Sequence, residues 1–308
     1  MDNPLTYLCG GSAWDSEGPF LSLTLPGGCA APVRLEPGTE LRFAVLDGGA
    51  GGGARFCLGA SVLDPEGQRR RLPCPGQYPA RRGYQCESCF TRDDLRHMHQ
   101  SHRNGYVPRA LEPYLAQPHW LYVATFAGSR TKVGTASQQR KDLRLAEQGA
   151  VAAQYVARAD NGRVVRVLED RVTEVLGLVQ AVRSGTKAAE LARHGAVAGL
   201  HAANDRHAAA ARDLLTSSGV GGFEVVQQRW QPPVRSAAVL AARALPYPLG
   251  LHNGEHGLMI DAVLGPTALV RVDGHEEHFL ADLSQLRGRR LVTGPYRSAL
   301  PALQDVLF

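Results

Sequence analysis

Four cysteines in the first third of the chain have the residue type and part of the spacing of a metal site. Cys86 and Cys89 are separated by two residues, and Cys57 and Cys74 precede them. A two-residue gap lets both thiolates reach one ion, and structural zinc takes four thiolate or imidazole ligands in a tetrahedron. Cys57, Cys74, Cys86 and Cys89 therefore form a candidate zinc-ribbon-like site, in which the metal would be structural because protein fills every position.

Two other interpretations of the cysteines stay open. His97, His99 and His102 follow closely, so two imidazoles could replace Cys57 and Cys74 beside the Cys-x-x-Cys pair. The thiols could also simply be reduced cysteines. A redox dithiol is disfavoured, because the pair does not open a helix in a thioredoxin-like unit.

Positive charge is concentrated between residues 66 and 109, where nine arginines face four acidic residues. The whole chain has 34 Lys and Arg against 29 Asp and Glu, for a net charge of +5. A local excess of this kind favours anionic partners, and phosphate contacts make binding salt-dependent. We expect nucleic acid, DNA or RNA, to contact Arg69, Arg70, Arg71, Arg81, Arg82, Arg96 and Arg103.

The elements that must position these residues can be read from hydrophobic periodicity. Residues 1–75 and 220–308 alternate in strand fashion between Gly and Pro turns, and the C-terminal strands favour a small half-barrel. The middle of the chain alternates between strands and helices. Its expected strands are 120–126, 131–135 and 152–157, and its expected helices are 137–148, 163–177, 187–200 and 203–215.

The start of this α/β stretch resembles the GIY-YIG nuclease family. That family has a strand ending in the tyrosine of Gly-Ile-Tyr, followed by a strand with Tyr-Ile-Gly. Tyr122 matches the first tyrosine, and Gly134 matches the glycine of the second strand. Trp120 stands where the first motif has glycine, and Lys132 stands where the second has tyrosine. The resemblance covers residues 118–200.

The same resemblance implies a catalytic site. The family has an arginine on the helix after the second strand, matched here by Arg140 or Arg144, and a metal-binding glutamate on a later helix, matched by Glu169. Tyr122 would be the general base, if a metal or a neighbouring cation stabilises its phenolate. Glu169 would ligate Mg2+ or Mn2+, and the arginine would clamp phosphate. Lys132 would bind phosphate in place of the missing tyrosine. Each residue also has an ordinary structural explanation, such as a core aromatic or a solvent-exposed helix ion pair.

The chain is also similar to an uncharacterised bacterial family, most clearly in residues 83–90 and 132–135. That likeness supplies no activity. Together the two resemblances predict an α+β fold: a central GIY-YIG-like three-stranded sheet with helices, β-rich segments at both ends and a zinc-ribbon-like insertion. The expected boundaries are 1–54, 55–117, 118–218 and 219–308.

Three classes of function remain. The first is metal-dependent phosphodiester hydrolysis of nucleic acid, the second is DNA or RNA binding without cleavage, and the third is an enzyme that acts on a small molecule in the same cleft. No Walker loop, Rossmann fingerprint or Gly-x-Ser-x-Gly element is present. No apolar run is long enough to span a membrane and no secretory signal is visible, so we expect a cytoplasmic protein.

Overall fold

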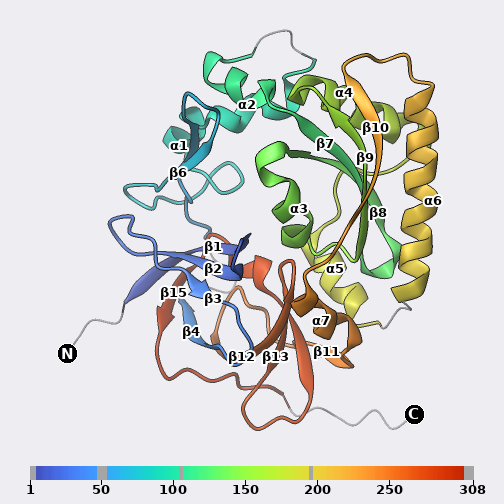
Figure 1. Ribbon diagram of the computed structural model, residues 1–308. Coiled ribbons are helices and arrows are strands. Elements are labelled where there is room, and N and C mark those ends of the chain that lie inside the picture. Colours follow the sequence, from blue (N-terminus) through green and yellow to red (C-terminus); the bar gives the residue numbers. More distant parts are fainter. Residues whose placement is uncertain (1–4, 47–53, 104–106, 194–196, 302–308) are drawn as a thin grey trace.

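The computed structural model describes residues 5–46, 54–103, 107–193 and 197–301 (Figure 1). Within these ranges the chain forms three sheets and seven α-helices, which confirms the α+β class. None of the helices in the described ranges has the length and apolar character needed to cross a membrane.

The largest sheet has nine strands, drawn from both ends of the chain. Its order is β11-β14-β13-β12-β4-β15-β1-β2-β3. The N-terminal strands are β1 (Thr6–Asp15), β2 (Gly18–Thr24), β3 (Val33–Arg34) and β4 (Glu40–Leu46). The C-terminal strands are β11 (Ala244–Pro246), β12 (Glu255–Leu264), β13 (Thr267–Arg271), β14 (His278–Asp282) and β15 (Arg290–Thr293). The sequence left open whether the two ends pack together. The structure shows that they share one sheet, with β15 hydrogen-bonded between β4 and β1.

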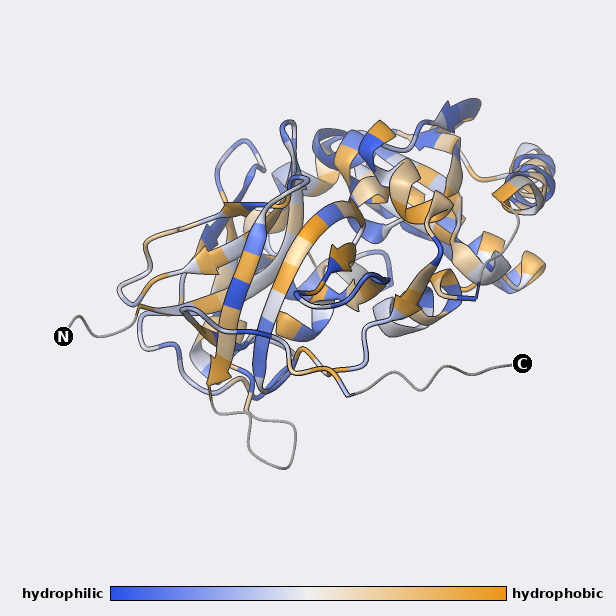
Figure 2. Ribbon diagram, turned by 90° about the horizontal axis from the view of Figure 1, so that it is seen from below, coloured by the Kyte–Doolittle hydropathy of each residue, from blue (hydrophilic) through white to orange (hydrophobic). Residues whose placement is uncertain are grey.

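Alternation explains why these residues form strands with one buried face. In β4, Leu41, Phe43 and Val45 are buried, and the residues between them are not. Successive side chains of a strand point to opposite faces, so the three face the core together with Leu258 and Ile260 of β12. Figure 2 shows the resulting change between hydrophobic and hydrophilic residues along the strands.

The second sheet has four strands in the order β10-β9-β7-β8, so the expectation of three was wrong. The strands are β7 (His119–Thr125), β8 (Thr131–Ser137), β9 (Ala152–Ala159) and β10 (Phe223–Trp230). The added strand is β10, which sequence patterning assigned to the C-terminal β segment. It pairs antiparallel with β9, and Phe223, Val226 and Trp230 pack onto this sheet's core clusters.

Helices cover both faces of the four-stranded sheet. They are α3 (Lys141–Gln148), α4 (Gly162–Leu176), α5 (Ser184–Leu191) and α6 (Val197–Thr216), and α7 (Ala237–Ala241) lies against β12. The expected helices 187–200 and 203–215 were placed wrongly, because α5 ends at Leu191 and α6 already begins at Val197. Alanine fills much of this stretch and fits either face of a helix, so periodicity could not place the boundaries.

The cysteine-bearing segment lies between the two sheets (Figure 1). It holds the hairpin β5 (Ala60–Leu63) and β6 (Arg69–Leu72), with the short helices α1 (Glu87–Thr91) and α2 (Glu112–Ala116). Helix α2 packs against α4, and Phe56 joins a small apolar cluster with Leu8 of β1. The segment therefore contacts the body of the protein on both sides.

Candidate functional site

The four cysteines named from the sequence meet at one buried point. The Sγ atoms of Cys57, Cys74, Cys86 and Cys89 all lie within 4.8 Å of one another. Four sulfurs around one zinc ion are about 3.8 Å apart, given Zn–S bonds of about 2.3 Å. Burial raises the pKa of the Cys89 thiol, so a bound cation would be needed to keep that sulfur as a thiolate. The donor set is therefore compatible with structural zinc.

The backbone around the cluster has a form that suits thiolate ligands. The amide of Gly59 donates a hydrogen bond to Sγ of Cys57 over 3.3 Å. Gly59 has φ of +90°, and a Cβ there would lie 1.9 Å from the Leu72 carbonyl oxygen, so only glycine fits. His102 bonds instead to Asp170 over 2.9 Å, and His97 contacts Arg96. The side chain of His99 lies outside the described residues.

A cavity of about 360 Å³ brings together the residues named from the nuclease resemblance. It lies along β8, the edge strand of the four-stranded sheet. Five candidates from five elements line it: Tyr122, Lys132, Arg140, Arg144 and Glu169.

Tyr122 is held in place from two sides. It is fully buried in β7 and faces Gly134 of β8 across the sheet, where a Cβ would lie 2.5 Å from the tyrosine hydroxyl oxygen. The side-chain amide of Gln148, at the end of α3, donates a hydrogen bond to that oxygen over 2.8 Å. Lys132 lies with Nζ 5.5 Å from the centre of the tyrosine ring.

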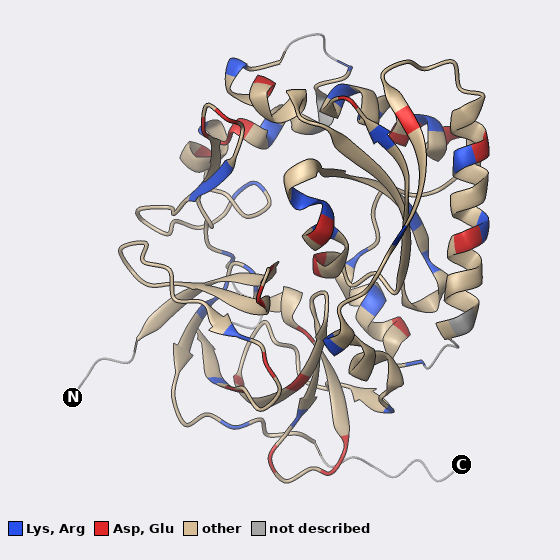
Figure 3. Cartoon of the chain, viewed as in Figure 1, with Lys and Arg blue, Asp and Glu red and all other residues tan. Residues whose placement is uncertain are grey.

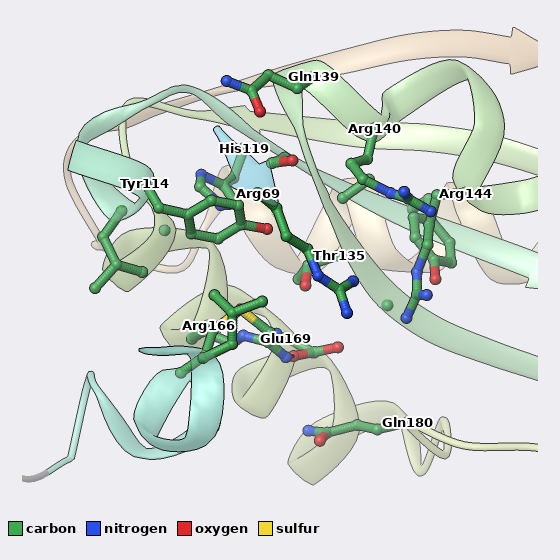
Figure 4. A pocket seen from close by; sticks show the side chains of 18 of the residues that line it. Arg69, Tyr114, His119, Thr135, Gln139, Arg140, Arg144, Arg166, Glu169 and Gln180 are labelled. Atoms are coloured by element: carbon green, nitrogen blue, oxygen red, sulfur yellow. Dashed lines mark hydrogen bonds and ion pairs between the residues drawn. The ribbon is translucent and has the colours of Figure 1, made fainter. Parts of the chain in front are cut away.

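A 3-10 turn (Gln138–Arg140) and the start of α3 bring Arg140 and Arg144 to the cavity, because both are tied to the sheet. The Tyr155 hydroxyl donates to the carbonyl of Lys141 over 2.6 Å, and the Trp120 indole donates to Gln138 over 2.7 Å. Arg140 pairs with Glu147 of α3. Arg144 has no ion-pair partner within the described part of the chain, and it extends into the cavity (Figure 4).

Helix α4 brings Glu169 to the opposite wall. Asn161 caps this helix by accepting hydrogen bonds from the amides of Arg163 and Val164. Only 3 % of Glu169 is exposed, so the alternative of a solvent-facing carboxylate does not hold, although the ion pair on the same helix does form. Arg166 donates to its Oε2 over 2.6 Å, and Glu169 is the only acidic residue among the described residues that line the cavity.

The basic segment reaches the cavity through some of its arginines only. Arg69 of β6 enters it between Glu169 and Arg144 (Figure 4). Arg70 points to the other face of the strand, and Arg71 lines an adjoining chamber. Of the remaining candidates, Arg81, Arg82, Arg96 and Arg103 are exposed away from the cavity, and Arg103 pairs with Asp170 over 2.6 Å. Figure 3 shows the Lys and Arg residues on β6 and α3.

Sequence reasoning missed three residues at this site. Arg166 pairs with the candidate metal ligand, and its spacing of three residues from Glu169 was the available signal. Gln148 and His119 carried no signal, because only the fold brings them to Tyr122 and to the cavity wall. Burial lowers the pKa of His119, so its imidazole is neutral near pH 7.

Comparison with known proteins gives one match. A family model described as a protein of unknown function (DUF2797) matches residues 77–186. No curated protein and no solved structure matches the chain. The matched range contains Cys86, Cys89 and the five cavity residues named above, but neither Cys57 nor Cys74. The expected likeness to a family of unknown function is thus confirmed, and the chain is similar to that family from residue 77 to residue 186.

Proposed function

We propose that the protein hydrolyses phosphodiester bonds in nucleic acid with the help of a divalent metal ion, at the cavity along β8. The observation that carries the proposal is convergence. Tyr122, Lys132, Arg140, Arg144 and Glu169 come from separate elements and line one cavity. Phosphodiester hydrolysis needs a base for water, a metal ligand and cations for the developing negative charge, and these side chains supply each of them.

Each side chain has a role that follows from its surroundings. Tyr122, as the phenolate, accepts the proton of the attacking water, and the Gln148 amide keeps its oxygen in place. Arg144 is free of ion pairs with described residues and binds the phosphate oxygens through its planar fork. Lys132 is buried beside Tyr122 and adds a further positive charge.

The cavity offers oxygen ligands that suit Mg2+ or Mn2+. Glu169 is the carboxylate that would hold the ion, with water filling the other positions. The hydroxyl oxygen of Ser137 lines the same cavity, is buried and has no hydrogen-bond partner among the described residues. When bound, the ion would stabilise the leaving oxygen. An ion bound at Oε2 of Glu169 would compete with Arg166, which pairs with that oxygen.

The direct test is cleavage of labelled single- and double-stranded DNA and RNA with Mg2+ or Mn2+. Glu169→Gln and Tyr122→Phe should each lower the cleavage rate by about 100-fold or more, while substrate binding persists. The matched control is Glu174→Gln, the same change at an exposed site on the same helix, which should cleave like wild type. Equal cleavage by wild type and Glu169→Gln would overturn the assignment.

A second function, nucleic-acid binding without cleavage, is favoured by one contact. The 2.6 Å ion pair with Arg166 neutralises the carboxylate that a metal would need. In that case binding would weaken steeply with salt, and no product would form in Mg2+ or Mn2+. If DNA and RNA show no affinity at low salt, the cavity takes a small molecule instead.

We also infer that the four-cysteine cluster holds Zn2+ and thereby fixes the hairpin that carries Arg69 and Arg71. The two arginines are on β6, which lies between Cys57 and Cys74 in the sequence. The zinc would thus have a structural role: it would hold the hairpin that positions the two arginines, and it would take no part in the reaction.

A further inference from the structure

A second chamber of about 650 Å³ adjoins the cavity along β8. The two spaces share part of their walls, namely Arg69, Lys132, Arg140, Arg144, Gln180 and Ala181. The second chamber extends from these residues toward the nine-stranded sheet, so it lies between the two halves of the protein.

Three further cations line this chamber but not the first cavity: Arg71 of β6, Lys187 of α5 and Arg287, three residues before β15. With the four shared cations, the chamber has seven positive side chains. Among its described residues the only acidic one is Glu147, which already pairs with Arg140. Cations that face one enclosed space repel one another, and they attract an anion.

Two of these cations have no acidic partner among the described residues. Neither Arg71 nor Lys187 forms an ion pair there, although Lys187 donates a hydrogen bond to the Gln148 carbonyl over 2.7 Å and its Nζ lies 3.9 Å from the centre of the Phe126 ring. Burial, followed by the charges of Lys132 and Arg144, lowers the pKa of Lys187 to about 7. Desolvation together with Arg287 and Arg69 lowers the pKa of Arg71, which lines the chamber, to about 10.

One buried donor on the walls also lacks a partner within the described residues, namely Nε of Arg287, whereas the other unpaired atom there, Oε1 of Gln148, is an acceptor and does not recognise phosphate. The guanidinium of Arg287 stacks on Tyr84, with 4.3 Å between Cζ and the ring centre, so its edge remains available for hydrogen bonds. Polar groups in such positions cost stability unless a ligand satisfies them.

Two glycines of β1 form the part of the chamber wall next to Arg287. Gly10 and Gly11 line it, at a bulge where the pairing with β2 shifts register. Gly11 has φ of +92°, a backbone conformation that residues with a side chain rarely adopt. The bulge that brings this strand to Arg287 therefore depends on glycine.

We propose that this chamber is a second phosphate-binding site, which holds a phosphate group of the nucleic-acid strand next to the phosphodiester in the first cavity. The identity of the ligand as a strand rests on the proposed function. The chamber's preference for phosphate rests only on its own cations.

The first test is calorimetric titration with inorganic pyrophosphate, without divalent metal and at low ionic strength. Arg71→Gln and Lys187→Gln should each weaken binding by about 10-fold or more, because each removes a charge-assisted contact. Arg92→Gln is the matched control: it makes the same change at an exposed arginine of the cysteine-bearing segment that lines neither cavity, and its affinity should equal that of wild type. No binding by wild type, or equal loss in Arg92→Gln and Arg71→Gln, would overturn the proposal. Urea unfolding establishes that each variant is folded.

The second test separates a strand phosphate from a free phosphate compound. Pyrophosphate should displace a fluorescein-labelled single-stranded oligonucleotide from wild type at the concentration at which it binds directly. Binding without displacement would refute the strand as the ligand. Displacement with no cleavage in Mg2+ or Mn2+ would refute hydrolysis and leave the phosphate chamber in place, so the two proposals fail separately.

Discussion

The hydroxyl oxygen of Tyr122 lies directly against the Cα of Gly134, its partner across the β7–β8 pair. A Cβ at Gly134 would be 2.5 Å from that oxygen and 2.6 Å from Cζ of the ring. The glycine therefore leaves the space that the tyrosine ring needs to reach the cavity. This gives a packing reason for the Lys-Val-Gly sequence that is independent of any family resemblance.

Gly134→Ala should push the Tyr122 ring away from the Gln148 amide. We expect a loss of about 1–3 kcal/mol in the free energy of unfolding, the usual cost of overpacking. If Tyr122 is the base, cleavage should fall as far as it does in Tyr122→Phe. Urea unfolding and the cleavage assay measure the two effects. Gly199→Ala is the control, because Gly199 lies in α6 with open space around it. This variant should raise the free energy of unfolding by about 0.5–1 kcal/mol.

Cysteine substitution tests the metal cluster. Purified wild type should contain about one zinc per chain by elemental analysis, and Cys86→Ser should contain less than half of that, because a tetrahedral site loses one ligand. The exposed Cys29 is outside the cluster, so Cys29→Ser should keep the metal. A zinc-free wild type, gently purified, would contradict the assignment.

Lys187 should make stability depend on pH above neutrality. Its ε-amine has a pKa of about 7 in the folded chain, against an ordinary lysine pKa of 10.5. Between these values the unfolded chain binds a proton that the folded chain does not, so this group makes stability rise with pH from about 7 to 10.5. The described charges that act on it are Lys132 and Arg144, which disfavour the proton, and Asp282, which favours it.

Lys187→Met should remove this slope. Each unit by which folding lowers this pKa reduces the free energy of unfolding by about 1.4 kcal/mol at a pH where the unfolded amine is protonated. Lys187→Met does not carry this cost, so at pH 7 it should be more stable than it otherwise would be relative to wild type. That difference in the free energy of unfolding should shrink by about 2 kcal/mol or more from about pH 7 to about pH 9.5. Lys187→Arg keeps its charge throughout and should show no such slope. Urea unfolding in phosphate-free buffers at both values gives the comparison, and parallel curves for wild type and Lys187→Met would contradict it.

Asp170 joins the cysteine-bearing segment to α4. Burial raises the pKa of this carboxyl, but hydrogen bonds from Arg103 and His102 outweigh that effect. With a third bond from Gln180, the pKa falls to about 2. A lowered carboxyl pKa gives stability that is present above about pH 4 and is lost as the pH falls toward 2.

Asp170→Asn should therefore lower the unfolding free energy at pH 7 by about 1–2 kcal/mol, a value reduced because Arg103 is largely solvent-exposed. The deficit should narrow below pH 4. Asp213→Asn, an exposed acid on α6 without a described side-chain partner, serves as control and should unfold like wild type. A constant deficit at every pH would show that Asp170 acts by packing alone.

The candidate residues could be named from the sequence because their spacing survives in strands and helices. Tyr122 and Gly134 meet since a hairpin of that length sets its own register. Helical periodicity predicts the helix that carries Glu169, but the glutamate itself is singled out only by the resemblance to the GIY-YIG family. Cys57 and Cys74 could be proposed as partners of Cys86 but not assigned to it. The chain between them folds through turns, and the sequence does not predict how close those turns bring the thiols.

The second chamber could not be predicted in the same way. Arg71, Lys187 and Arg287 lie at least one hundred residues apart in the sequence, and no periodic pattern connects them. They meet because β6, α5 and the turn before β15 all border the same chamber. The pairing of β10 with β9 could not be predicted either. The sequence of an edge strand with many polar residues indicates a strand but not the sheet that it joins.

The position of β15 between β4 and β1 has a consequence for how the protein is made. During synthesis the first four strands leave the ribosome long before residues 290–293 exist, and two of them must wait with an unpaired edge. The four-stranded sheet, by contrast, has all its strands by residue 230. The order of translation thus favours early folding of the middle of the chain, with the sheet formed by the two ends completed last.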